Sequence, residues 1–211
     1  MIGFEEITMI SGVAPILVGA VSFRRLPLAL KLLFGLTIYS AVSNIITASL
    51  AYNTINNMPF FHLYAWIEMI ILFFIFWNIL HSKKKKLAVV IIAIALIALS
   101  IVNLLFIERH WQFNGNQLYA EGLVMIFFSL LYFVQIFQEM KIKRMEDHPY
   151  FWMCSCMLIY FAGNLFLFIV MGKYGRALNT DYWMILHSSL MLLLNIGYTL
   201  TLWKGTRLTQ S

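Results

Sequence analysis

The feature that most limits what this chain can fold into is a series of seven apolar runs. Each run has about the 20 residues that an α-helix needs to cross a lipid bilayer. The runs predict helices near residues 4–23, 28–51, 60–80, 87–107, 117–139, 149–171 and 182–203. Only short polar segments separate them, so residues 1–211 are expected to form a single all-α, polytopic membrane domain.

The breaks between the runs carry turn and helix-start signals. Pro27, Pro59 and Pro149 stand at expected helix starts, where a residue without an N–H group is tolerated. The Asn-Gly-Asn sequence at 114–116 is typical of a turn. Because the breaks leave so little chain outside the membrane, they exclude a soluble catalytic domain and a DNA-binding domain.

Composition identifies lipid as the main solvent of this chain. Charged residues make up 11% of it, and the mean hydropathy is +0.82. Soluble domains contain about twice that charged fraction. The net charge of +6 does not predict a nucleic-acid partner, because the charges lie in the breaks between apolar runs. Cys154 and Cys156 point to nearly opposite sides of one predicted helix, so no disulfide is expected.

Lysine and arginine predict the direction of the seven helices. Short loops on the cytoplasmic side of a membrane are enriched in these residues. One side of the predicted bundle carries twelve of them and the other three: Arg24, Arg25, Lys31, Lys83, Lys84, Lys85, Lys86, Lys141, Lys143, Arg144, Lys204 and Arg207 against Arg109, Lys173 and Arg176. The N-terminus is therefore expected outside and the C-terminus in the cytoplasm. The four consecutive lysines are interpreted as a topology anchor that touches anionic lipid, with a headgroup or partner site as the alternative.

Polar residues inside the predicted helices concentrate in the outer half of the membrane. Glu68 is the single acid in the apolar run FHLYAWIEMIILFFIFWNIL (61–80), about 12 Å from the outer end of its helix. An ionised carboxylate in hydrocarbon costs at least about 2.5 kcal/mol, so such groups usually mark a functional or paired site. The other polar positions in this layer are His187, Glu121, Tyr64 and the asparagines Asn44, Asn103 and Asn164. Together with Glu68, these six residues are the predicted lining of a ligand cavity.

Helical spacing predicts which faces turn inward. Polar and aromatic residues recur at three- and four-residue steps on four helices, and lipid cannot satisfy their polar groups. The stripes are Thr37, Ser40, Asn44 and Thr47 on the second helix, Phe61, Tyr64 and Glu68 on the third, Gln117, Glu121, Phe128, Tyr132 and Gln135 on the fifth, and His187, Met191, Leu194, Asn195 and Tyr198 on the seventh.

Each polar residue also has a structural interpretation. The three asparagines are the right type to bridge helices, and Glu121 is close enough to the interface for partial solvation. Glu68 and His187 are the obvious pair if the third and seventh helices are neighbours, either in a functional site or as a buried ion pair. These alternatives stay open at this point.

Several chemistries lack their sequence signature. The last helix has no central lysine for retinal, no two histidines are spaced as in His-Glu-x-x-His, and there is no P-loop. A metal site from Glu68, Glu121, His187 and His62 has suitable ligand types but no motif spacing. No cofactor is expected, and the balance is against an enzyme.

The segments FHLYAWIEMIILFF (61–74) and WMILHSSLMLLLNIGYTLTLWK (183–204) resemble stretches of uncharacterised small seven-helix bacterial inner-membrane proteins. The resemblance extends over the third to seventh helices. It implies a fold and a location in the inner (cytoplasmic) membrane, and no activity.

The sequence therefore predicts a membrane protein of the binding or sensing type. A small or lipid-like ligand would occupy the outer-half cavity, and a cytoplasmic signalling partner would detect its presence. The alternatives are a membrane-embedded metal-dependent hydrolase and a small-solute transporter. The transporter interpretation depends on polar groups of the inner half, which are Gln135, Asn195 and Tyr198.

Overall fold

The computed structural model describes residues 4–107, 111, 113–139, 144–174 and 180–206, and every regular element among them is helical. The described helices form seven spans that are long and apolar enough to cross a membrane, which indicates a multi-pass membrane protein. The elements are α1 (Phe4–Ser11), α2 (Val13–Ser22), η1 (Phe23–Arg25), α3 (Leu28–Tyr52), α4 (Met58–Ile79), α5 (Lys83–Val102), η2 (Asn103–Ile107), α6 (Gly115–Glu139), η3 (Met145–Asp147), α7 (Pro149–Tyr174) and α8 (Thr180–Gly205).

The predicted spans are confirmed, and most of their ends agree within a few residues. The first span differs because it is broken at Gly12, between α1 and α2. Pro15 has no N–H group to donate to the carbonyl of Ser11, which removes one helical hydrogen bond at this point. At the same break, the N–H group of Gly12 bonds to the carbonyl of Met9, three residues earlier, at 3.2 Å.

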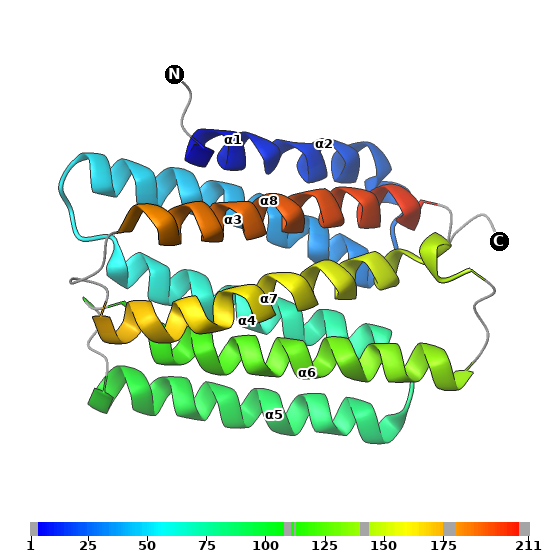
Figure 1. Cartoon of the computed structure of the whole chain (residues 1–211). Helices are drawn as coiled ribbons and strands as arrows, with labels where there is room; N and C mark the ends of the chain where they lie inside the picture. Colours follow the sequence, from blue (N-terminus) through cyan, green and yellow to red (C-terminus); the bar gives the residue numbers. More distant parts are fainter. Residues whose placement is uncertain (1–3, 108–110, 112, 140–143, 175–179, 207–211) are drawn as a thin grey trace.

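Consecutive spans pack side by side around the bundle (Figure 1). Each of the helices α3 to α7 contacts the next one along the chain, and the first span packs against α8 and closes the circle. Figure 1 shows α1 and α2 along one edge of the bundle and α5 along the opposite edge. Across the bundle, α3 also contacts α8 and α4 contacts α6.

The two ends of the bundle differ in charge. We call them the Asn57 end (left in Figure 1), which contains the start of α4, and the Lys83 end (right), which contains the start of α5. The four lysines and η1 lie at the Lys83 end. Five of the fifteen basic residues that were used to predict the orientation lie outside the described residues. They are Lys141, Lys143 and Arg207 of the predicted cytoplasmic set, and Arg109 and Arg176 of the predicted outer set.

Small residues allow close approach between helices at several points. A Cβ atom at Gly19 would overlap the ring of Phe34, so α2 and α3 depend on a glycine there. A Cβ atom at Gly197 on α8 would likewise overlap the side chain of Cys156 on α7. Small residues at helix contacts are typical of membrane bundles, where van der Waals packing drives association.

Large side chains fill the half of the bundle nearer the Lys83 end. Phe73, Phe76 and Phe128 are at most 5% exposed, and the rings of Phe73 and Phe128 meet edge to face at 5.8 Å. The predicted stripe on α6 is confirmed as an inward face, because Gln117, Glu121, Phe128, Tyr132 and Gln135 are all buried. Dense packing around these rings leaves the larger of the two cavities described below to the other half.

Candidate functional site

A cavity of about 620 Å³ lies between the first span, α3, α4, α7 and α8. It runs from Ala51 and Asn57 near one end of the bundle to Leu36 and Tyr198 past its middle. The stripe predicted on the second helix forms one wall, because Thr37, Ser40, Asn44 and Thr47 all line the cavity. A volume of this size is in the range of small-molecule sites in proteins.

Glu68 lies at the middle of α4 and lines the cavity. It is ten residues after Met58, which is about 15 Å along the helix axis. The sequence placed it slightly nearer the end because the helix was expected to begin at Phe60. Glu68 interacts with the side chain of Tyr64, one turn earlier on the same face.

Tyr64 connects Glu68 to α3. Its hydroxyl group donates a hydrogen bond to the Oγ atom of Ser40, with an O–O distance of 3.4 Å. Its ring stacks on that of Tyr39, with centroids 5.3 Å apart and planes at 10°. The position of Tyr64 is therefore set by two contacts with α3 as well as by its own helix.

His187 also lines the cavity, but it is paired with Asn164 rather than with Glu68. Its Nδ1 atom lies 2.8 Å from the Oδ1 atom of Asn164 on α7. The Nδ2 atom of Asn164 donates to the carbonyl of Tyr160 at 2.8 Å, so this asparagine holds two groups at once. Within the described part of the chain, Glu68 and His187 form no ion pair, and α4 and α8 are not close neighbours.

Glu121 is behind the cavity and does not line it. It is 1% exposed, and neither carboxylate oxygen has a hydrogen-bond partner among the described residues. The partial solvation considered from the sequence is therefore not what the structure shows. Glu121 is close enough to Glu68 to interact with it electrostatically, so two acids from α6 and α4 share this region.

The three asparagines separate in space. Asn44 lines the cavity. Asn103 lies at the start of η2 and accepts a hydrogen bond from Asn116 at 3.2 Å, away from the cavity. Four of the seven predicted site residues line the cavity: Glu68, His187, Asn44 and Tyr64. Asn164 does not line it but is hydrogen-bonded to His187, which does.

Sequence reasoning missed Tyr160, which lines the cavity from α7. The signal was present, because Tyr160 precedes Asn164 by one helical turn and shares its face. The sequence predicted Asn195 only as an inner-half group, whereas it lines the cavity. Its Nδ2 atom donates a hydrogen bond to the Oγ atom of Ser11 at 2.8 Å, at the break in the first span. Tyr198 was assigned to the inner half, yet it lines the same cavity.

The described residues do not form the metal site considered from the sequence. No three histidine, cysteine, aspartate or glutamate side chains among them are grouped closely enough to hold a metal ion.

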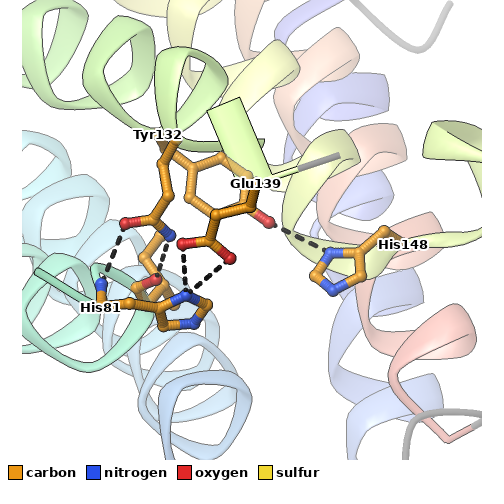
Figure 2. Close-up of polar contacts among 6 residues, drawn as sticks. His81, Tyr132, Glu139 and His148 are labelled. Carbon is orange, nitrogen blue, oxygen red and sulfur yellow. Dashed lines mark hydrogen bonds and ion pairs between the residues drawn. The ribbon is translucent and has the colours of Figure 1, made fainter. Parts of the chain in front are cut away.

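A second polar cluster lies at the Lys83 end (Figure 2). The Nδ1 atom of His81 is 2.9 Å from the carboxylate of Glu139, and the hydroxyl group of Tyr132 is 3.1 Å from the Nδ1 atom of His148. Gln135 accepts a hydrogen bond from the backbone N–H group of His81 and donates one to the carbonyl of Ile79. These groups surround a cavity of about 240 Å³.

Burial lowers the pKa of His148 below its usual range, and the nearby His81 adds a smaller effect in the same direction. The Nδ1 atom of a neutral imidazole can accept a hydrogen bond from the Tyr132 hydroxyl group. This cluster therefore favours an uncharged His148 at the boundary of the bundle.

Comparison with known proteins gives no assignment. No protein-family model, no curated protein and no solved structure matches this chain.

Proposed function

We propose that this protein binds a small or lipid-like ligand in the 620 Å³ cavity and reports its presence to a partner in the cytoplasm. The observation that supports this proposal is the cavity itself, in which Glu68, His187 and Asn44 face a common space. Bundles without a ligand usually fill such space with side chains, as this chain does near Phe76 and Phe128.

The proposal includes an orientation. The Lys83 end faces the cytoplasm of a bacterial cell, and the N-terminus lies outside the inner membrane. The excess of lysine and arginine at the Lys83 end supports this orientation. The cavity then opens toward the outer side, and the cluster of His81 and Glu139 lies toward the cytoplasm.

In this proposal, helix α8 transmits the presence of a ligand in the cavity to the Lys83 end of the bundle. Three of its turns line the cavity, through His187, Asn195 and Tyr198. At its other end, the Nζ atom of Lys204 lies 3.4 Å from a carboxylate oxygen of Asp147 in η3. A ligand that shifts α8 would change this contact, which a cytoplasmic partner would detect.

Transport is the second candidate, because the structure has cavities toward both ends of the bundle with packed aromatic side chains between them. For a solute to pass from one cavity to the other, Phe76 would have to separate from Phe128, and their ring centroids are 5.4 Å apart. Flux of solutes into liposomes that contain the purified protein distinguishes transport from sensing.

Filling the cavity tests the proposed function. Ala41 lines the cavity, whereas its neighbour Val42 is 49% exposed on the outer surface of the bundle. Native mass spectrometry of the protein, released from its own membrane, should detect a bound molecule in the wild type and in Val42→Trp. Ala41→Trp should lack it. Protein that carries no bound molecule in any of the three forms would contradict the proposal.

A further inference from the structure

We propose that the ligand is an amphipathic organic cation, an amine or a quaternary ammonium compound, with its charged nitrogen at Glu68. This inference rests on the proposed function, because it names the class of ligand for the same cavity. It is supported by three independent properties of the cavity: its charge, its aromatic residues and its lipid-facing wall.

The charge of the cavity calls for a positive ligand. Among the described residues, its lining contains the carboxylate of Glu68 and no lysine or arginine. Glu121 adds a second carboxyl group within electrostatic range of Glu68, and both of its oxygens are buried without a partner among the described residues. His187, the histidine on the described lining, is hydrogen-bonded to Asn164. An acid away from bulk water is stabilised by an opposite charge, which a cationic ligand would supply.

Aromatic residues surround the same acid. Tyr64, Tyr160 and Tyr198 line the cavity from three different helices, and each lies within electrostatic range of Glu68. Aromatic rings attract cations through the negative potential of their faces, and several rings around one acid are a recurring arrangement for ammonium groups. A neutral or anionic head group would gain nothing from the rings and would leave Glu68 without a counter-charge.

The opposite wall favours an apolar extension on the ligand. Met9, Val13 and Ile45 line the cavity and are also 51%, 49% and 67% exposed on the outside of the bundle. These side chains belong to the first span and to α3. In a membrane this wall faces lipid, so an alkyl or aryl part can lie along it and a ligand can reach the cavity from the bilayer.

Three probes of similar size and different charge test the inference. Phenethylamine, phenethyl alcohol and phenylacetate are titrated into the purified full-length protein in an uncharged detergent, with calorimetry as the readout. The amine should bind at least about tenfold more tightly than the alcohol or the carboxylate. Glu68→Gln should lower the affinity for the amine at least about tenfold and change that for the alcohol by less than about twofold.

Three further variants separate the contribution of charge from that of the aromatic rings. Tyr198→Phe retains the aromatic face and should keep the preference for the amine, whereas Tyr198→Leu should weaken it. Glu139→Gln removes an acid at the Lys83 end and should leave the affinities for all three probes unchanged. The comparison of the three probes on the wild type does not depend on the folding of any variant.

The outcomes for the two proposals are distinct. Equal or tighter binding of the alcohol or the carboxylate overturns the assignment of a cation, as does a preference that survives Glu68→Gln. A co-purified molecule without a basic nitrogen also overturns it and leaves the proposed binding function intact. If no molecule co-purifies and no probe binds, both proposals are wrong.

Discussion

The Nδ1 atom of His187 lies 2.8 Å from the Oδ1 atom of Asn164, and this contact joins α8 to α7 beside the cavity. Sequence spacing alone suggested Glu68 as the partner of His187. The observed pair leaves the acid of α4 facing the cavity without a cationic partner among the described side chains, which is the basis of the proposed ligand class.

The contact between His187 and Asn164 should be measurable as a coupling energy. A double-mutant cycle of His187→Ala and Asn164→Ala, followed by thermal unfolding in detergent, should give a coupling energy of about 0.6 kcal/mol, the average for interhelical hydrogen bonds in membranes, and at most about 1.7 kcal/mol. The matched pair His187→Ala and Asn103→Ala should be additive, because Asn103 bonds to Asn116 elsewhere. Additivity in the first pair would contradict the contact.

Gly197→Ala should destabilise the bundle, because its new Cβ atom would overlap Cys156 and push α8 away from α7. Gly35→Ala is the control: nothing lies within 4 Å of a Cβ atom there, and alanine favours a helix over glycine by about 1 kcal/mol. Thermal unfolding should show a lower midpoint for the first variant and an equal or higher one for the second. Cys156→Gly should partly rescue Gly197→Ala.

Glu121→Met should raise the unfolding midpoint, because it replaces a buried acid without a partner by an apolar side chain of similar length. Gln117→Met, one turn earlier, should lower the midpoint, because the Oε1 atom of Gln117 accepts a hydrogen bond from the Trp66 indole at 3.2 Å. The expected difference is about 1 to 3 kcal/mol. A destabilised Glu121→Met protein would mean that the acid has a partner, such as bound water.

Stability should fall as the pH is lowered below about 6.5, because of His148. Burial, with His81 as the second cause, makes the pKa of His148 lower in the folded protein than in the unfolded chain. Between these two pKa values the unfolded chain binds more protons, so the stabilising effect is complete above the unfolded value and is lost as the pH falls through the folded one. Midpoints measured from about pH 7.5 to about pH 5 should show this slope, and His148→Asn should flatten it.

The orientation can be tested with single cysteines. Cys154 and Cys156 are buried, so neither should react with a membrane-impermeant maleimide. Ile55→Cys, at an exposed site of the Asn57 end, should be labelled from outside intact cells. Lys84→Cys, at an exposed site of the other end, should be labelled only after the membrane is opened. The reverse pattern would place the cavity toward the cytoplasm.

The seven spans and the half of the bundle that carries most polar groups could be read from the sequence. The reason is that the bilayer imposes a length on each apolar run and a cost on each polar group within it. The sequence also predicted that Gln117, Glu121 and Gln135 share an inward face, because helical periodicity places them on one side of their helix independently of the helices around it.

Only the tertiary structure decided which of these groups meet. Helices that are apolar on every side do not encode their own rotation, so the sequence could not exclude a pair of Glu68 and His187 or show that Glu121 lies behind the cavity. The cluster of His81, Glu139 and His148 had no local signal at all, since His81 and Glu139 are 58 residues apart. Hydropathy is a property of each segment by itself, whereas a site of this kind is a property of how the segments pack.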